Sequence, residues 1–293
     1  MHTVAGFGEL LWDILPGGKQ MGGAPGNFAC HIGALGEEGV VISRVGDDSP
    51  GRELLARLDK LGVGHEYVTI DPAHPTGRST VELDAKGVPS FLVHENVAWD
   101  FIEYTPRLAD FARNVDAVYF GTLPQRSAVS GETVRLFLKN TRPSALRLFD
   151  ANLRRPHFSR DVVEVSLETA TAAKLNDAEL DVLGDYFSLR GEAATQLRRL
   201  VDRFELKLAA LTRGERGSLL VAGDRTAVHP GCPTRVADTV GAGDAFAATL
   251  VVGLLAGLDI DRINEQANRV ASFVCSKPGA TPALPRELLE DLV

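Results

Sequence analysis

Short apolar segments alternate with amphipathic segments along most of the 293 residues, and this alternation limits the possible folds more than any other feature. The pattern predicts a strand at 3–15, a helix at 24–36, a strand at 39–46 and a helix at 49–62. The same order resumes after residue 117. Strands joined by crossover helices form parallel sheets with helices on both faces. We therefore expect an α/β fold around a central, mostly parallel sheet.

The alternation is broken at 79–102 by two strand-like segments around a Lys86–Gly87 turn, which indicates a small β-excursion. Further along, residues 171–180 fit a short strand followed by a turn. Helices are expected from about Asp244 and at 262–276, and a helical tail is expected at the end. The length suits one large α/β domain or a domain with an excursion.

Composition excludes several classes of function. The chain carries 31 Lys and Arg against 39 Asp and Glu, a net charge of −8, and has no basic run, which argues against nucleic-acid binding. Its three cysteines, Cys30, Cys232 and Cys275, lack the spacing of metal ligands. They predict reduced thiols in a cytosolic protein and argue against structural zinc.

No segment is expected to cross a membrane. The apolar N-terminal stretch contains Glu9 and Asp13 and follows no basic region, unlike a signal peptide. The apolar run at 249–258 is too short to span a bilayer. We expect a soluble, cytoplasmic protein.

The segment DTVGAGDAF at 238–246 is the strongest candidate for chemistry. Gly241 and Gly243 precede a long apolar run, so the N–H groups at a helix N-terminus can face an anion there. Asp244 lies at the start of that helix, where the positive helix end favours an ionised carboxylate. A carboxylate base beside an anion site suits phosphoryl transfer to an alcohol. The alternative is a tight turn capped by Asp244; the chain contains no Walker A motif, and Phe246 replaces the third glycine of a dinucleotide fingerprint.

Five further segments accompany this motif. They are GELLWD at 8–13, GGAPGNFA at 22–29, KLNDAEL at 174–180, LTRGERGSLL at 211–220 and ANRVASFVCSKPGATPALP at 267–285. Together with DTVGAGDAF, and in this order, they resemble the PfkB/ribokinase family of carbohydrate kinases along nearly the whole chain. The resemblance implies a single ribokinase-like domain, 1–293, with a three-layer α/β/α core. It also implies a small β-sheet lid built from about 9–21 and 77–98.

The resemblance assigns roles to residues of the two glycine-rich signatures. Asp244 would be the catalytic base, and the anion hole would be formed by Gly241, Ala242 and Gly243. The acceptor sugar would be bound by Asp13, Gly22, Gly23 and Asn27. Carboxylates and amides suit a polyol because they form directional hydrogen bonds with hydroxyl groups. Without the family, Asp13 is a loop-capping residue and Asn27 is a helix cap.

The remaining segments imply sites for ATP and Mg²⁺. The nucleotide would contact Asn176, Thr212, Arg213, Gly214, Gly217 and Asn268. Glu179 would hold Mg²⁺ through water, as expected for a cation that keeps much of its hydration shell. Lys174 could add charge nearby or be solvated, and Arg213 and Arg216 could be surface residues.

A monovalent-cation site beside the anion hole is also implied. It would use carbonyl groups near Val240, Lys277 and Gly279 and the carboxylate of Asp238. Many members carry a serine where this chain has Ala283, so activation by potassium is left open. Asp238 could instead brace the loop.

The acceptor is suggested by two stretches. In DANLR, at 150–154, Arg154 resembles an arginine common in fructokinases and 2-keto-3-deoxygluconate kinases; a surface arginine is the alternative. In the lid hairpin, His94, Glu95 and Asn96 stand where kinases of keto-deoxy acids often carry an arginine. An acidic residue there would repel a carboxylate substrate and favours a neutral sugar. The resemblance therefore favours an ATP-dependent kinase acting on the 6-hydroxyl of D-fructose.

Other functions remain open at this point. The acceptor could be another ketose, 2-keto-3-deoxygluconate, ribose or a nucleoside. A non-catalytic sensor of sugar or nucleotide is a further alternative, although a sensor is expected to lose Asp244 or the glycines of the anion hole. The partners would be the sugar and ATP, with a homodimer formed through the apolar face of the lid. Trp99 and Phe101 are expected to pack in the lid or an interface rather than stack on sugar.

Overall fold

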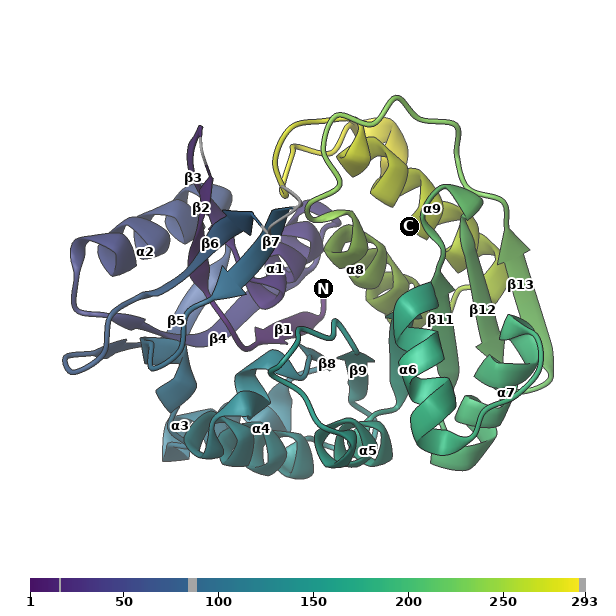
Figure 1. The fold of residues 1–293 in the computed structure, drawn as a ribbon, viewed down its shortest axis with the longest axis horizontal. Coiled ribbons are helices and arrows are strands. Elements are labelled where there is room, and N and C mark those ends of the chain that lie inside the picture. Colours follow the sequence, from purple (N-terminus) through teal and green to yellow (C-terminus); the bar gives the residue numbers. More distant parts are fainter. Residues whose placement is uncertain (16, 84–88, 290–293) are drawn as a thin grey trace.

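A mostly parallel sheet runs through the centre of the computed structural model, which describes residues 1–15, 17–83 and 89–289 (Figure 1). Its strands are Thr3–Phe7 (β1), Glu38–Gly46 (β4), Gly64–Asp71 (β5), Ala117–Phe120 (β8), Leu146–Asp150 (β9), Ala172–Asn176 (β10), Leu208–Thr212 (β11), Ser218–Ala222 (β12) and Arg225–His229 (β13). They lie in the order β13-β12-β11-β10-β9-β8-β1-β4-β5. The pairs from β5 to β11 that follow this order are parallel, and β12 and β13 are antiparallel additions at one edge.

Helices cover both faces of this sheet, as Figure 1 shows. One face carries Ala24–Ala34 (α1), Ser49–Leu61 (α2), Ala242–Leu255 (α8) and Ile260–Cys275 (α9). The other carries Pro106–Asn114 (α3), Ala128–Asn140 (α4), Arg160–Thr169 (α5), Asp177–Phe187 (α6) and Ala193–Phe204 (α7). The expected α/β/α layers are confirmed, and the carboxyl ends of the parallel strands form one rim, where ligands of such sheets bind.

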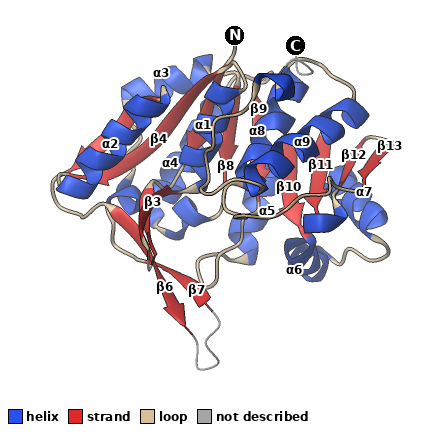
Figure 2. Cartoon of the chain, turned by 90° about the horizontal axis from the view of Figure 1, so that it is seen from above, coloured by secondary structure: helices blue, strands red, loops and turns tan. Residues whose placement is uncertain are grey.

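A second, smaller sheet projects from the body (Figure 2). Its strands, Gly18–Gly22 (β3), Leu11–Leu15 (β2), Gly77–Leu83 (β6) and Pro89–Val93 (β7), lie in that order. They come from the two segments expected to form the lid. The predicted turn at Lys86–Gly87 falls outside the described residues.

Three sequence-based expectations were wrong. Residues 3–15 form two strands in different sheets, because the backbone turns at Gly8 with φ of 148°. The turn expected within 171–180 is the start of α6, which Asn176 caps. The expected C-terminal tail is a short 3₁₀ turn, Arg286–Leu288, as far as residue 289. The pattern also failed to indicate β3, β5, β13, α3 and α5.

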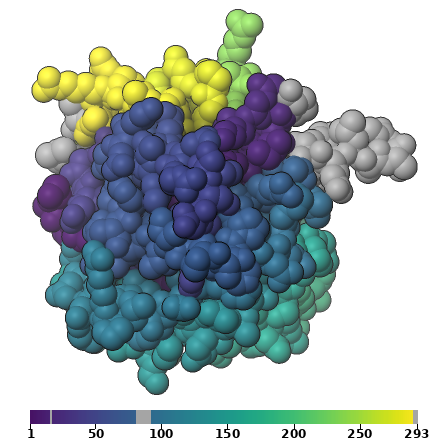
Figure 3. Space-filling model, turned by 90° about the vertical axis from the view of Figure 1, so that its left-hand side faces the viewer, coloured from purple at the N-terminus to yellow at the C-terminus, as the bar shows by residue number. Residues whose placement is uncertain are grey.

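The C-terminal segment lies beside the N-terminal strands of the small sheet (Figure 3). A cavity of about 260 Å³ is lined by residues of both, among them Met21 and Gly279. In the part of the chain that is described, no helix is both long and apolar enough to cross a membrane.

Candidate active site

Asp244 lies in the first turn of α8, at the carboxyl-end rim of the large sheet. Gly241 is the N-cap residue and has no side chain with which to cap the helix, so the first N–H groups face outward. The Nδ2 atom of Asn27 on α1 donates to Oδ2 of Asp244 at 2.9 Å. Burial raises the pKa of Asp244 to about 6, against the opposing hydrogen bond from Asn27 and the positive charge of Lys174. A carboxylate that ionises near neutral pH suits a general base.

Asn27 is not a helix cap. The N-cap of α1 is Gly23, and Asn27 is buried inside the helix with its amide directed to Asp244. The helix-cap interpretation was therefore wrong, and the two glycine-rich signatures meet through this hydrogen bond. Any contact between Asn27 and a sugar stays a prediction.

The loop before α8 is fixed by the C-terminal segment. A Cβ atom on Gly241 would lie 2.2 Å from the carbonyl oxygen of Ala280, to which His31 is bound through Nε2 at 2.9 Å. Asp238 accepts hydrogen bonds from the N–H groups of Val240 at 3.0 Å and Gly279 at 3.1 Å. Asp238 thus braces the two loops.

The acceptor-side residues gather at the base of the small sheet. Asp13, on β2, accepts a short hydrogen bond from Ser79 on β6. A Cβ atom on Gly22 would lie 2.2 Å from Oδ2 of Asp13, so glycine is required there for the carboxylate to fit. Burial raises the pKa of Asp13, while Ser79 and the charge of Arg154 oppose that rise. The charge of Arg154, an exposed residue, also opposes the rise in the pKa of Asp244.

The nucleotide-side residues follow neighbouring strands. Asn176 at the end of β10 pairs with Thr212 at the end of β11. Asn176 and Glu179 form a capping box, in which each side chain accepts the other's backbone N–H. Glu179 is buried, not part of an exposed turn, and also accepts the N–H of Leu153 at 3.0 Å.

The turn from β11 to β12 contains Arg213, Gly214 and Gly217. Gly214 and Gly217 have φ of 59° and 76°, which favours glycine. The guanidinium of Arg213 donates to the carbonyl of Ser218, and that of Arg216 pairs with Asp177. Asn268 of α9 is buried, and its Nδ2 donates to Ser218 and Asn264. These residues lie at the side of the rim formed by β10, β11 and β12, and their contact with a nucleotide stays a prediction.

Two buried groups were missed or misjudged from the sequence. Glu9, within the quoted GELLWD segment, accepts the N–H of Ala24 at 3.2 Å, and burial raises its pKa to about 7. Lys174 is not solvated: its Nζ atom lies 2.9 and 3.1 Å from the carboxylate oxygens of Asp150. The signal for this pair is a charged residue within each of two adjacent apolar strands.

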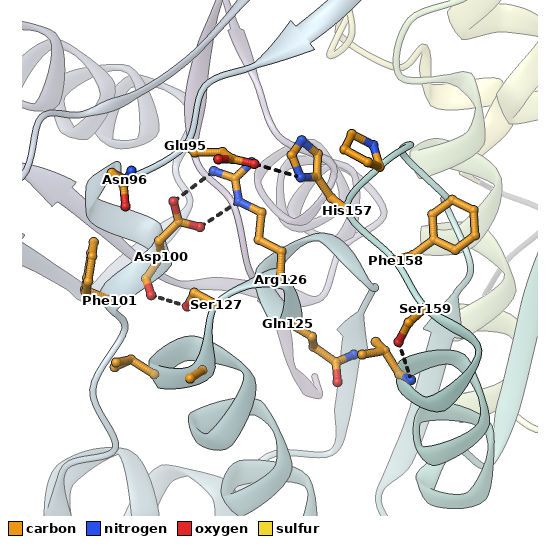
Figure 4. Close-up of a pocket in the computed structure, with 14 residues that line it drawn as sticks. Glu95, Asn96, Asp100, Phe101, Gln125, Arg126, Ser127, His157, Phe158 and Ser159 are labelled. Carbon is orange, nitrogen blue, oxygen red and sulfur yellow. Dashed lines mark hydrogen bonds and ion pairs between the residues drawn. The ribbon is translucent and has the colours of Figure 1, made fainter.

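A cavity of about 640 Å³ lies between the end of the small sheet and the starts of α4 and α5 (Figure 4). Arg126 lies in its wall with a largely buried side chain, held by Asp100 at 2.7 and 2.8 Å and by the carbonyl of His94 at 2.6 Å. Glu95 contributes an exposed carboxylate beside His157, at 3.4 Å, and burial lowers the pKa of that histidine. Since Asp100 neutralises Arg126, the cavity has a net negative charge.

The two aromatic residues predicted to pack do pack. Trp99 is fully buried in the main core, with the Arg126 guanidinium 3.9 Å from its ring centre. Phe101 stacks on His74 and lines the cavity. Trp99 therefore belongs to the core and not to the lid sheet.

Known proteins that are similar in sequence and fold are carbohydrate kinases. Residues 14–287 match the family described as pfkB family carbohydrate kinase. An uncharacterized sugar kinase from Pyrococcus horikoshii is 30% identical over 297 residues, 94% of this chain and 91% of the relative. Its structure in complex with ATP superimposes with a TM-score of 0.84, covering 99% of this chain and 100% of that one.

Two fructokinases are also similar. The fructokinase of Klebsiella pneumoniae is 29% identical over 299 residues, 95% of each chain. The fructokinase of Vibrio cholerae, solved with fructose, ADP and calcium, has a TM-score of 0.84 at 24% identity, covering 100% of this chain and 99% of that one. The second likeness concerns the fold alone.

Proposed function

This chain belongs to the pfkB family of carbohydrate kinases and is a sugar kinase, and we propose that it transfers the γ-phosphoryl group of ATP to the 6-hydroxyl of D-fructose. The observation that carries this proposal is the Asp244 carboxylate in the first turn of α8, beside N–H groups that no N-cap side chain covers. The similar fructokinases support the choice of acceptor.

In the proposed reaction, Asp244 accepts the proton of the acceptor hydroxyl as its oxygen bonds to the γ-phosphorus. The bond from that phosphorus to the β,γ-bridging oxygen breaks, and ADP leaves with its electron pair. The N–H groups of Gly241, Ala242 and Gly243 stabilise the charge on the transferred group. Asn27 keeps the base in place by its hydrogen bond at 2.9 Å.

We assign the nucleotide to the rim beside β10 and β11, with contacts to Asn176, Thr212, Arg213, Gly214, Gly217 and Asn268. Glu179 fits a role toward Mg²⁺: two backbone N–H groups occupy part of its oxygen lone pairs, and the rest can accept from metal-bound water. The ion would neutralise phosphate charge when bound. Among the described residues there is no cluster of three His, Cys, Asp or Glu side chains that could hold a metal, consistent with Mg²⁺ held largely by phosphates and water.

A monovalent cation such as K⁺ fits the loop pair that Asp238 braces. The carboxylate of Asp238, with carbonyl groups near Val240, Lys277 and Gly279, would supply the oxygen ligands. A cation there would strengthen the positive field at the start of α8.

We propose that Asp13, Gly22, Gly23, Asn27 and Arg154 hold the sugar and that the 640 Å³ cavity adjoins its end remote from Asp244. One chain segment links the cavity to this site. His157, which lines the cavity, follows Arg154 closely and donates its N–H to the Arg154 carbonyl. The net negative charge of the cavity disfavours sugar acids and favours a neutral acceptor.

The small sheet fits the role of a lid that covers the sugar and excludes water, which would suppress hydrolysis of ATP. The protein would form a homodimer through the face of this sheet that is directed away from Asp13. It would be located in the cytoplasm, where ATP is available.

The test compares kcat/KM with Mg-ATP for fructose, other ketoses, ribose, nucleosides and 2-keto-3-deoxygluconate. We expect fructose to dominate. Glu95→Gln should raise kcat/KM for the sugar acid relative to fructose by roughly fivefold, because one exposed charge at about 4 Å is worth about 1 kcal/mol. Glu168→Gln, an exposed change on α5 outside the cavity, should leave the ratio unchanged. A different acceptor dominating would refute the choice of fructose.

A further inference from the structure

Lys174 is buried beneath the Gly241–Gly243 turn, in a position that the proposed reaction has not used. It lies on β10 in register with Asp150 on β9, and its ammonium binds both oxygens of that carboxylate. The Tyr119 hydroxyl, from β8, donates to Oδ2 of Asp150 at 3.0 Å. Three adjacent parallel strands therefore fix one ammonium group at the carboxyl-end rim.

The ammonium lies against the turn itself. A Cβ atom on Gly243 would be 3.2 Å from Nζ of Lys174 and 4.0 Å from its Cε. Asp150 accepts two of the three N–H bonds that an ammonium can donate. The positive group thus lies next to the backbone of α8 at the residue that precedes Asp244.

The buried ion pair of Lys174 and Asp150 is not explained by a gain in folding stability. A buried ion pair is often no more stabilising than apolar residues of similar volume, because both charges lose their hydration. Lys174 and Asp150 are 8% and 1% exposed, so both are desolvated. Although burial opposes it, the neighbouring carboxylates raise the pKa of Lys174 and keep it charged.

We propose that Lys174, clamped by Asp150 and Tyr119, is a positioning residue of the transfer reaction, whose fixed ammonium holds the neighbouring Asp244 in its ionised form. The inference rests on the proposed function in taking Asp244 as the base. It predicts that Lys174 lowers the pKa of Asp244 and that Asp150 raises it.

Several buried or charged groups influence the ionisation of Asp244. The groups that act on it or respond to its charge are Glu9, Asn27, Cys30, Tyr119, Asp150, Arg154 and Lys174. Burial is the largest influence and raises the pKa of Asp244; Lys174 lowers it and Asp150 raises it. An ion pair that does not act on the base would leave its ionisation unchanged after either partner is removed.

The experiment is the pH profile of kcat/KM for fructose at saturating Mg-ATP, which reports the ionisation of the base in the enzyme before the acceptor binds. The acid limb of the unaltered enzyme should lie near pH 6. Lys174→Met should move that limb upward by roughly 1 unit or more, the size expected for losing one nearby opposite charge. Asp150→Asn should move it downward. Lys207→Met, at an exposed lysine just before β11, should not move it.

The double variant Lys174→Met, Asp150→Asn removes the pair together, leaves no unpaired buried charge, and should return the limb toward pH 6. If Lys174→Met fails to fold, Asp150→Asn and the double variant still show in which direction each charge shifts the acid limb. Limbs that stay in place, or shift in the same direction for both single variants, would overturn the inference. An active Asp244→Asn enzyme would instead refute the proposed base, so the two failures are distinguishable.

Discussion

Gly241 has two separate reasons to be glycine, and neither is visible in the motif. Its φ of 80° lies in the left-handed region, and an added Cβ would lie 2.2 Å from the carbonyl oxygen of Ala280. The glycine therefore lets the C-terminal segment approach the turn, which in turn places the start of α8. The sequence predicted a close approach to phosphate but could not show this contact across the fold.

Gly241→Ala should lower the free energy of unfolding by about 1–3 kcal/mol, the cost of a strained backbone position, and should reduce turnover. Gly33→Ala is the matched control, because it lies in α1 and nothing is within 4 Å of the added Cβ. That variant should gain about 0.5–1 kcal/mol. Urea denaturation of both variants provides the measurement. Equal stability of Gly241→Ala and the unaltered protein would contradict the role of Ala280.

The sequence predicted positions along the chain better than contacts between distant residues. The start of a helix beside Gly241 and Asp244 was predicted from one nine-residue segment, whereas the roles of these residues stay predictions. Lys174 was left as charged or solvated because its partner, Asp150, lies 24 residues away on the neighbouring strand. Asn27 looked like a cap because its partner, Asp244, is 217 residues away. Periodicity cannot report such contacts.

The small sheet has two distinct faces, which its register defines. Asp13, Ser79 and Val93 form one row across β2, β6 and β7, and Ile14, Thr80 and Leu92 form the next row. Successive residues of a strand face opposite sides, so the row with Asp13 faces one way and the row with Ile14 the other. Ile14 and Leu92 are 39% and 43% exposed, so the outer face presents apolar side chains beside Thr80 and Lys19.

At low micromolar concentration we expect a dimer held by this outer face, and Ile14→Lys should convert it to a monomer. Burying an unpaired ammonium in the interface would outweigh the apolar contact that the isoleucine provides. Val228→Lys is the control, at an apolar residue on the edge strand β13 that is 64% exposed. Sedimentation velocity distinguishes the species. A monomeric unaltered protein, or a dimeric Ile14→Lys variant, would contradict the assignment.

Elements were predicted well where amphipathic periodicity is strong. Helix α2 spans Ser49–Leu61 and stops at Gly62, as the sequence indicated; the structure adds that the Asp48 side chain accepts the N–H of Gly51. The prediction of a single strand at 3–15 was wrong for a physical reason. Both halves of this segment are apolar, so the hydrophobic pattern does not show that the backbone turns at Gly8 and that the second half joins another sheet.

At the scale of the molecule, the parallel sheet explains why residues from distant segments meet. The strands β1, β8, β9, β10 and β11 run in the same direction, so the residues that follow them gather at one rim. The order of motifs predicted this fold. Burial raises the pKa values of Glu9 and Asp244. This burial arises only when the helices pack on the sheet, so it could not be predicted from the sequence.

The central claim, that Asp244 is the base of a sugar kinase, is tested most directly with Asp244→Asn. The amide keeps the size of the side chain but cannot accept the hydroxyl proton. With Mg-ATP and D-fructose, we predict that kcat falls by about 10²–10⁴-fold, the usual contribution of a general base. The affinity for ATP, measured by calorimetry, should remain close to that of the unaltered enzyme. Near-normal turnover by this variant would contradict the account.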